Sequence, residues 1–388
     1  MKNSSECVGN LVEVSVIIPS LNEAGTISTC IEKVKAVFRQ YGIDGEIIVA
    51  DNSDDDTPRI ARSLGAKVVT PDRRGYGYAY LYGFKHAKGK YLVVGDADNT
   101  YDFLEMPRLL EPLMKGEADM VIGSRFRGEI KKGAMPWLHR YVGNPVLTGF
   151  LNLFFKTGVS DAHCGLRAIR KDALEKMSLR SYGMEFASEV ITEAARRKLR
   201  IKEVPVTYYP RGSSDSKLNS FSDGWRHLKF MLIYAPTYLY LLPGLVFCLF
   251  GALMMLLSYF AVDIGYTPGF HSMIVGSLLV IVGYQVMFLG LFSKIYGVHV
   301  DLFDADRVTE LILKHASLEK GAIIGVTIFL AGFVYSGYLV AKWVSSGFAV
   351  LPLKEEDIIA FTLLILGLQT FFNSFFLSML SNQQEVFS

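Results

Sequence analysis

Residues 91–101 read Tyr-Leu-Val-Val-Gly-Asp-Ala-Asp-Asn-Thr-Tyr, an apolar run followed by two carboxylates two positions apart. The apolar run predicts a buried strand at Tyr91–Gly95, and the polar residues predict the loop beyond its carboxyl end. Residues two apart on an extended segment face the same way, so Asp96 and Asp98 offer two carboxylates on one side. This arrangement suits an oxygen-preferring divalent cation that would neutralise a diphosphate leaving group.

The segments before Tyr91 alternate between strand and helix patterns, which indicates βαβ units and a largely parallel sheet. Apolar runs of strand length occur at Val14–Ile18, Glu46–Ala50 and Lys67–Thr70. Helical patterns occur at about residues 24–41, Asp56–Leu64 and Tyr78–Ala87. Because ligands of such sheets bind beyond the carboxyl ends of the strands, the loops that follow these strands are the candidate site.

Two further residues are placed at that edge by the strands they follow. Asp51 comes directly after a predicted strand, where its carboxylate could accept from a base N–H or a ribose hydroxyl. We interpret the neighbouring Asp54–Asp56 as caps of the next helix. Arg125 follows the strand-like run Met120–Ser124 and so begins at the ligand edge. The other basic residues of that segment fit a solvated face equally well.

The charge distribution separates this half of the chain from the rest. Residues 1–233 contain 34 Lys and Arg and 28 Asp and Glu, whereas residues 234–388 contain only 6 and 10. Four apolar runs in the second part are long enough to cross a bilayer as helices. They are Tyr234–Phe260, Ser272–Ile295, Ala322–Val344 and Ile358–Leu380. The mean hydropathy of +0.28 is therefore an average over a soluble domain and a membrane domain.

Basic residues precede the first span, the loop between the first and second spans has no Lys or Arg, and the loop between the second and third spans holds Lys294, Arg307, Lys314 and Lys320. By the positive-inside rule we expect the first domain on the cytoplasmic side. No secretory signal pattern precedes Val14. The four scattered cysteines show neither disulfide nor zinc spacing, which suits a reducing compartment. The net charge of +2 does not favour a nucleic-acid binder.

Two apolar stretches in the first part are shorter than a span. Pro145–Phe155 fits a core segment and a helix in the bilayer interface equally well. Phe221–Phe230, with Trp225, Arg226, His227 and Lys229, indicates an interfacial helix. The domain organisation that we expect is therefore a cytoplasmic domain over 1–220, an amphipathic linker helix over 221–233 and a membrane domain over 234–388.

Eight motifs in order make the first part resemble the family-2 glycosyltransferases with a GT-A fold, and among them the polyprenyl (dolichyl) phosphate sugar synthases. The resemblance covers about Val14 to Phe230. The motifs are Val14–Glu23, Ile47–Thr57, Arg74–Gly77, Gly95–Asp98, Val121–Arg125, Asp161–Leu166, Glu185–Glu189 and Tyr209–Lys217. The resemblance implies an α/β fold, a GT-A Rossmann-like mixed sheet, here followed by an all-α transmembrane domain of four helices.

The resemblance also implies roles for individual residues. Asp98, Arg125 and Arg211 would be catalytic, and Asp96 and Asp98 would hold Mg²⁺ or Mn²⁺ against the donor diphosphate. The residues expected to bind the nucleoside, the sugar and the phosphates are Pro19, Asn22, Glu23, Asp51, Gly75, His163, Glu189, Ser216 and Lys217. Asn52 stands where the family usually has a second Asp, so the base contact departs from the family pattern.

The implied function is inverting, metal-dependent transfer of one sugar from a nucleotide-sugar to a membrane polyprenyl phosphate for glycan assembly. The Gln-X-X-Arg-Trp motif of processive synthases is absent from the sequence, which favours single transfer. The loops at Arg74–Gly77 and Asp161–Leu166 look more like those of UDP-glucose or UDP-N-acetylglucosamine enzymes than of GDP-mannose enzymes, and GDP-mannose is the alternative donor. A homo-oligomer is left open.

Two other classes were weighed. A glycolipid translocase or membrane scaffold subunit would use the four spans, but the spans carry almost no ionisable residue to support transport. A nucleotide-sugar pyrophosphorylase would need a glycine-rich phosphate loop directly after the first strand. The segment Pro19–Glu23 contains no glycine, which disfavours that class.

Overall fold

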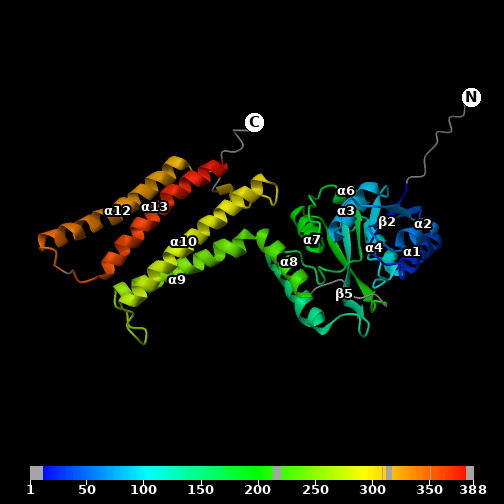
Figure 1. The fold of residues 1–388 in the computed structure, drawn as a ribbon, viewed down its shortest axis with the longest axis horizontal. Helices are drawn as coiled ribbons and strands as arrows, with labels where there is room; N and C mark the ends of the chain where they lie inside the picture. Colours follow the sequence, from blue (N-terminus) through cyan, green and yellow to red (C-terminus); the bar gives the residue numbers. More distant parts are fainter. Residues whose placement is uncertain (1–11, 213–219, 308, 312–316, 350, 382–388) are drawn as a thin grey trace, which may run out of the picture. The chain divides into compact units, whose positions relative to one another are not determined.

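The computed structural model describes residues 12–212, 220–307, 309–311, 317–349 and 351–381. The chain divides into two compact units, Met1–Met231 and Leu232–Ser388. Figure 1 shows sheet and helices in the first unit and long helices in the second. The mixed-sheet domain and the helical membrane domain expected from the sequence are therefore both present.

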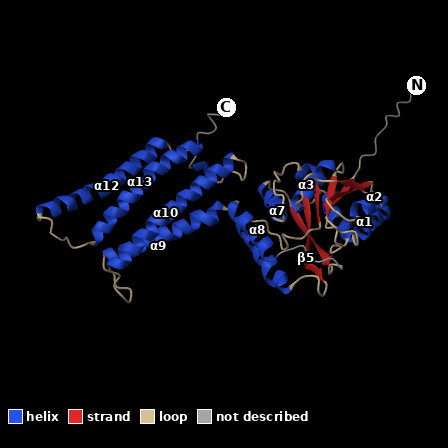
Figure 2. Cartoon of the chain, in the orientation of Figure 1, coloured by secondary structure: helices blue, strands red, loops and turns tan. Residues whose placement is uncertain are grey.

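The first unit is built on a seven-stranded sheet with the strand order β3-β2-β1-β4-β6-β5-β7 (Figure 2). The strands are β1 (Val14–Ser20), β2 (Gly45–Asp51), β3 (Lys67–Val69), β4 (Tyr91–Val94), β5 (Met120–Ile130), β6 (Arg167–Arg170) and β7 (Ile201–Tyr208). Strands β1 to β4 pair in parallel, as do β5 and β7. Strand β6 runs antiparallel to both of its neighbours, so the sheet is mixed.

The helices of this unit follow the expected alternation with the strands. They are α1 (Ile27–Tyr41), α2 (Thr57–Ser63), α3 (Tyr76–His86), α4 (Met106–Met114), α5 (Asn144–Phe155), α6 (Lys171–Leu174), α7 (Phe186–Arg196) and α8 (Ser220–Ile233), with short turns η1 (Phe103–Glu105) and η2 (His139–Gly143). Each of the seven elements expected before residue 96 is present to within about three residues at its ends. Strand β5 runs further than expected, so Arg125 lies inside a strand.

The core lies on the two faces of the central strands. All seven residues of β1 and all four of β4 are buried, as expected for parallel strands covered on both faces. Helix α3 approaches β1 closely because Gly83 has no side chain, and a Cβ there would come within 2.5 Å of the Ile17 side chain. The central strands are thereby held rigidly, and their carboxyl ends form a fixed edge for the loops that follow.

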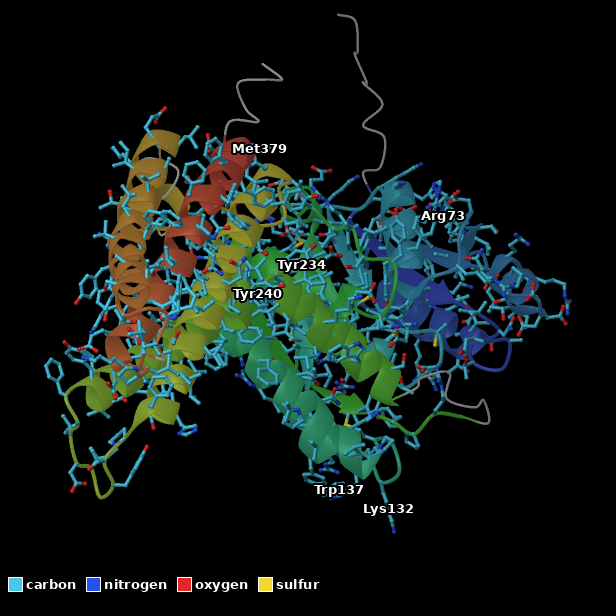
Figure 3. All side chains as sticks on the ribbon, turned by 60° about the vertical axis from the view of Figure 1, so that its left-hand side comes forward. Arg73, Lys132, Trp137, Tyr234, Tyr240 and Met379 are labelled. Carbon is cyan, nitrogen blue, oxygen red and sulfur yellow. The ribbon has the colours of Figure 1, made fainter. Side chains whose placement is uncertain are left out.

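Helix α5 lies on the surface and not in the core, so the core interpretation of this stretch is wrong. Only Thr148 and Leu151 of the helix are buried. The preceding segment exposes Trp137, which Figure 3 labels beside Lys132, and Tyr141. An exposed apolar and basic surface of this kind is typical of a segment that binds at a membrane interface.

In its described residues, the second unit contains one short helical segment and four long apolar helices. They are η3 (Thr237–Leu241), α9 (Leu242–Tyr259), α10 (Phe270–His299), α12 (Leu318–Ser345) and α13 (Glu355–Ser381). In the described part of the chain, four segments are long and apolar enough to span a membrane, namely Thr237–Tyr259, Phe270–His299, Leu318–Ser345 and Glu355–Ser381. Each contains most of one predicted span, so the protein is a membrane protein with four spanning helices.

Glycines bring these helices together in two pairs. In the pair α9 and α10, a Cβ on Gly283 would lie 2.6 Å from the carbonyl oxygen of Gly244, and one on Gly276 would lie 2.7 Å from that of Gly251. In the pair α12 and α13, a Cβ on Gly367 would lie 2.4 Å from the backbone nitrogen of Phe329. Small residues permit this approach of helix backbones, which is how helices associate in lipid.

Candidate active site

The loops after β1 and β2 meet at the carboxyl edge of the sheet through a serine. The buried carboxylate of Asp51 accepts from the Ser53 hydroxyl (2.5 Å) and backbone N–H (3.1 Å). Ser53 Oγ in turn accepts from the backbone N–H of Asn22 (2.7 Å). Asn22 has φ 54°, in the left-handed region that Asn tolerates. The predicted nucleoside residues Asn22 and Asp51 therefore lie together, and Pro19 pairs in register with Ala50 beside them.

A second group joins the loop after β4 to the segment after β7. Arg211 Nη2 lies 2.7 Å from Asp98 Oδ2 and 3.6 Å from Glu23 Oε1. The other carboxylate oxygen of Asp98 accepts from the backbone N–H and the hydroxyl of Thr100 (3.0 and 2.6 Å). Three residues predicted for the site from three different motifs are thus in contact. They bring one cation and two carboxylates to the edge of the sheet.

Asp96 has different partners from Asp98, although the two are two residues apart. Its Oδ1 accepts from the hydroxyls of Tyr76 (3.0 Å) and Tyr80 (3.3 Å) on α3. Its Oδ2 packs against Gly165, where a Cβ would come within 2.4 Å. Burial and the charge of Asp98 raise the pKa of the Asp96 carboxyl to about 6. This carboxylate therefore lies between α3 and the loop that contains Gly165.

The donor set at Asp96 and Asp98 consists of hard oxygen atoms, which suits Mg²⁺ or Mn²⁺. Among the described residues, no group of three or more His, Cys, Asp and Glu side chains could hold a metal ion. Mg²⁺ is commonly bound by one or two carboxylates together with substrate phosphates. Two carboxylates at this edge fit that mode of binding, with the remaining ligands left to diphosphate and water.

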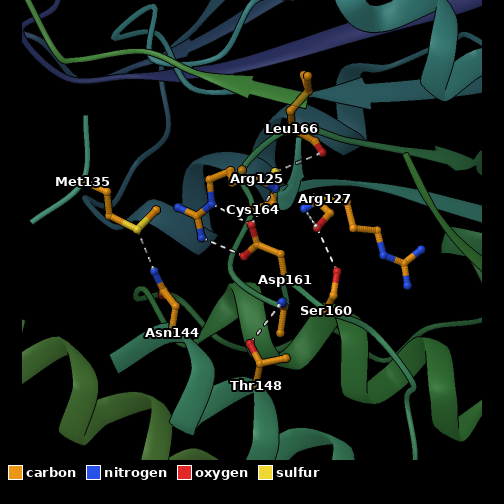
Figure 4. A network of polar contacts seen from close by, with 12 residues as sticks. Arg125, Arg127, Met135, Asn144, Thr148, Ser160, Asp161, Cys164 and Leu166 are labelled. Carbon is orange, nitrogen blue, oxygen red and sulfur yellow. Dashed lines mark hydrogen bonds and ion pairs between the residues drawn. The ribbon is translucent and has the colours of Figure 1, made fainter. Parts of the chain in front are cut away.

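Arg125 is paired with a carboxylate of the loop that precedes β6 (Figure 4). Its Nε and Nη2 each lie 2.7 Å from an oxygen of Asp161, and its backbone N–H also donates to Asp161 (3.0 Å). Both side chains are buried. The loop is held from the other side by Glu203 of β7, which accepts from the backbone N–H groups of Ser160 (2.7 Å) and Asp161 (3.1 Å).

Gly75 and Glu189 both contact the segment that precedes α7. A Cβ on Gly75 would lie 2.5 Å from the carbonyl oxygen of Tyr182, so this position accommodates only glycine without a shift. The Glu189 carboxylate accepts from the backbone N–H groups of Arg180 (2.8 Å) and Ser181 (2.9 Å). These contacts place both predicted residues around one segment, which they hold against the first turn of α3.

His163 contacts α7 through the hydroxyl of Ser188, at 3.2 Å from its Nε2. Burial, followed by the nearby charges of His227, Arg125 and Arg167, holds the pKa of His163 well below its ordinary value. His163 is therefore a neutral imidazole at neutral pH. The last two predicted residues, Ser216 and Lys217, lie outside the described residues.

Several residues at this edge were not assigned to the site from the sequence, and one of them, His227, was expected on the polar face of an interfacial helix but is buried. They are Ser53, Tyr76, Tyr80, Thr100, Ser188, Glu203 and His227. Tyr76 and Tyr80 are four residues apart, which places both hydroxyls on one face of a helix, and this spacing can be read from the sequence. Ser53 and Thr100 each donate to the aspartate two positions before them, which is also a local pattern. Ser188, Glu203 and His227 have partners far away in the chain, and no local pattern identifies them.

The sequence comparisons agree with this architecture. Residues 15–178 match the family model described as glycosyl transferase family 2, and residues 291–381 match the glycosyltransferase family 2 C-terminal transmembrane region. The chain is 48% identical over 368 residues to the low-salt glycan biosynthesis hexosyltransferase Agl6 of Haloferax volcanii, covering 95% of this chain and 89% of that protein.

Two further matches each cover a little more than half of the chain. A dolichyl-phosphate hexose transferase of Haloferax volcanii is 30% identical over 216 residues, which is 55% of this chain and 89% of that protein. The crystal structure of glucosyl-3-phosphoglycerate synthase from Mycobacterium tuberculosis aligns with a TM-score of 0.46 at 23% identity, over 57% of this chain and 78% of that one. With the mixed sheet, the four spans and a relative matched over nearly its whole length, this chain belongs to glycosyltransferase family 2.

Proposed function

We propose that this enzyme transfers one sugar from a nucleotide-sugar to a polyprenyl phosphate, with inversion at the anomeric carbon. The contact of Arg211 with Asp98 and Glu23, at the carboxyl edge of the sheet, carries the proposal. It puts a cation and oxygen ligands where a diphosphate would bind in a sheet of this type. The same chain contains four helices suited to a membrane, where a polyprenyl acceptor resides.

On this proposal, the loops of β1 and β2 bind the nucleoside. The Asp51 carboxylate accepts from base or ribose donors, and Ser53 and Asn22 keep it oriented. Asp96 and Asp98 would hold Mg²⁺ or Mn²⁺, which would supply positive charge to the departing diphosphate. The guanidinium of Arg211 adds a second positive charge beside Asp98. Positive charge held there before reaction would favour the state in which negative charge develops on the leaving group.

The acceptor phosphate is already anionic at neutral pH, so its attack on the anomeric carbon needs no strong general base. The residues then contribute positioning and exclusion of water. Attack from the side opposite the leaving group inverts the centre, so an α-linked nucleotide donor gives a β-linked product. Arg125 is held by Asp161 and contributes through the geometry of β5 and the loop over residues 159–166.

A membrane-bound acceptor also explains the exposed surface around α5. Trp137 and Tyr141 are 68% and 58% exposed, and Lys131, Lys132 and Arg140 lie close to them in the chain. Aromatic and basic side chains of this kind bind the interface of an anionic membrane. We propose that this surface faces the cytoplasmic leaflet, where the phosphate of a polyprenyl lipid lies at the water boundary.

UDP-glucose and UDP-N-acetylglucosamine are the donors that we propose, with GDP-mannose as the alternative. The full-length protein, purified and incorporated into lipid nanodiscs with polyprenyl phosphate and Mg²⁺, should be incubated with each of these donors. A β-linked lipid-phosphate sugar formed from one UDP-sugar is the expected product. Release of nucleoside diphosphate with every donor, without any lipid-linked product, would contradict the proposed acceptor.

The same assay tests whether Asp96 and Asp98, which we call the acidic pair, bind a metal ion. Substitution of Asp98 by asparagine removes a charge that interacts with the cation, and we expect transfer to fall about 100–1,000-fold, equivalent to a few kcal/mol of barrier. Chelation with EDTA should abolish transfer, and added Mg²⁺ or Mn²⁺ should restore it. Asp172→Asn, an exposed carboxylate paired with Arg170, is the matched control and should leave transfer unchanged. Full activity of Asp98→Asn, or transfer that is insensitive to EDTA, would refute the metal assignment.

A further inference from the structure

Three side chains from different segments form a hydrogen-bonded chain beside the loop at residues 161–166. Ser188 Oγ, at the start of α7, lies 2.8 Å from Nδ1 of His227 on α8 and 3.2 Å from Nε2 of His163 in the loop. The two imidazole rings are 4.5 Å apart between centroids and nearly perpendicular. We call these three residues the His–Ser–His chain.

The His–Ser–His chain is buried, although α8 also carries exposed side chains. His227 is 6% exposed and Ser188 is fully buried, whereas Trp225 on the same helix is 56% exposed. Burying an imidazole and a hydroxyl is unfavourable unless they are hydrogen-bonded, and an apolar contact would avoid that penalty. The contact of Ser188 with His227 differs from an apolar contact between α7 and α8, because it fixes the direction of the hydrogen bond at His163.

One polar atom of the His–Ser–His chain has no hydrogen-bond partner in the part of the protein that the structure describes. Nδ1 of His163 is buried and has no hydrogen-bond partner among the described residues. Two residues further along the loop, Gly165 packs directly against the Asp96 carboxylate. A buried nitrogen without a partner, in a loop that borders the acidic pair, is suited to bind a hydroxyl group of a bound sugar.

The protonation of His227 Nδ1 determines whether Nδ1 of His163 donates or accepts a hydrogen bond. The Ser188 hydroxyl has one proton, so it donates to one imidazole and accepts from the other. If His227 Nδ1 donates, Ser188 must donate to His163 Nε2, and the single proton of neutral His163 then lies on Nδ1. If Ser188 donates to His227, the proton lies on His163 Nε2 and Nδ1 is an acceptor. The tautomers of the two histidines are therefore coupled.

We propose that His227 and Ser188 are positioning residues that fix the ring orientation and the tautomer of His163, so that His163 Nδ1 binds a hydroxyl group of the donor sugar. This inference rests on the proposed function, in which the sugar of a nucleotide-sugar lies beside Asp96. Helix α8 ends at Ile233, and the first spanning segment begins at Thr237, so only three residues connect them. The helix that leads into the membrane therefore also supports the sugar site.

The experiment uses variants that keep or remove single nitrogen positions. Asparagine places its amide near the Nδ1 position of histidine and glutamine places it near Nε2. His227→Asn can still bond to Ser188, whereas His227→Gln and Ser188→Ala cannot. His163→Gln can bond to Ser188 but lacks an equivalent of Nδ1. The readouts are kcat and KM for the nucleotide-sugar, the Kd of the corresponding nucleoside diphosphate, and the thermal midpoint.

We expect Ser188→Ala, His227→Gln and His163→Gln each to lower kcat/KM for the sugar donor about tenfold or more, as expected for loss of one oriented hydrogen bond. The Kd of the nucleoside diphosphate should stay within twofold, because that molecule lacks the sugar. His227→Asn should remain within threefold of the unsubstituted enzyme. Adding Ser188→Ala to His163→Gln should cause little further loss, since both act on one contact. His271→Asn, an exposed histidine at the start of α10, is the control.

Unchanged kcat/KM in His227→Gln and Ser188→Ala would overturn the proposal. Parallel loss of diphosphate affinity, or fully additive losses in the double variant, would overturn it too, because either indicates general disruption of the fold. If one variant lowers the thermal midpoint, the difference in kcat/KM between His227→Asn and His227→Gln still tests the proposal. Hydrolysis of the donor by water without lipid reports the same sugar contact, so a failure of the proposed acceptor is distinguishable from a failure of this inference.

Discussion

In the first unit the guanidinium of Arg125 is buried against the carboxylate of Asp161, whereas in the second unit α9 and α10 approach each other at Gly244 and Gly283. The first contact places two opposite charges together in a protein interior. The second removes side chains so that two backbones can touch. Both contacts fix the position of one segment relative to another, yet they use opposite chemistry.

The difference follows from the solvent in which each unit folds. In water, apolar burial drives folding, and a polar group inside must be paired with another. In lipid, the surroundings of a helix are as apolar as a protein core, so close packing and a few hydrogen bonds hold helices together. In the first unit, removing one member of a buried polar pair should therefore be costly, because the other member is left unpaired. In the second unit, changes that separate closely packed backbones should matter most.

The largest effect is expected at the buried ion pair. Asp161→Ala leaves the Arg125 guanidinium buried without its carboxylate, and we expect the free energy of unfolding of the first unit to fall by about 3–5 kcal/mol. Chemical denaturation followed by fluorescence of bound nucleotide or of tryptophan would measure the loss.

The control for this variant is Asp56→Ala. Asp56 also forms a bidentate pair with an arginine, Arg59, at 2.9 Å, but both side chains are exposed. We expect no measurable change, because water screens an exposed pair. Equal losses in the two variants would show that burial does not decide the strength of ion pairs here.

An intermediate effect is expected at the glycine contacts of the membrane helices. Gly283→Ala would place a Cβ 2.6 Å from the Gly244 carbonyl oxygen, so α9 and α10 must separate. Overpacking of this kind lowers stability by about 1–3 kcal/mol. Unfolding of the full chain in mixed micelles, followed by helix content, measures it, and the Kd of the nucleoside diphosphate should not change.

Gly337→Ala on α12 is the matched control, because a Cβ there meets no atom within 4 Å. Alanine is the better helix former, so this variant should be as stable as the original chain or slightly more stable. Destabilisation of Gly337→Ala by as much as Gly283→Ala would mean that glycine itself, and not close approach, matters in these helices.

The smallest effect is expected for a hydroxyl contact within the membrane unit. Ser277 on α10 lies 2.6 Å from the Thr362 hydroxyl on α13. Thr362→Val keeps the shape of the side chain and removes this bond, with an expected loss of about 0.6 kcal/mol. Thr327→Val, an exposed threonine that bonds only within its own helix, is the control. A loss above about 3 kcal/mol for Thr362→Val would make polar contacts as important here as in the first unit.

Local patterns in the sequence were sufficient to predict most elements of the fold. The alternation of apolar runs predicted β1 to β4 and the helices between them, and the low charge of residues 234–388 predicted four spans. The interpretation of Pro145–Phe155 stayed open, because an apolar run of helix length is equally compatible with a core and with a surface. Its exposure depends on what packs beside it, and the sequence of the helix does not contain that information.

In the candidate site, the ends of the predicted strands indicated where the acidic residues lie in the sheet. They did not indicate which residues each of them contacts. Asp96 and Asp98 follow a buried strand, and this alone placed them at the ligand edge. The sequence predicts that they face the same way, but the tertiary structure directs Asp96 toward Tyr76 and Tyr80 and Asp98 toward Arg211. Those partners come from α3 and from the segment after β7, which only the closed sheet brings together.

Periodicity and composition act over a few residues, and they determined strands β1 to β4, the spans and the order of the acidic loops. Contacts between distant segments depend on the sheet order β3-β2-β1-β4-β6-β5-β7, in which β6 pairs with β4 and β5. That strand order brings Glu203 within hydrogen-bond distance of the loop that contains Asp161. The packing of α8 brings His227 within hydrogen-bond distance of Ser188. Such contacts are set by the free energy of packing the whole domain, which no short segment contains.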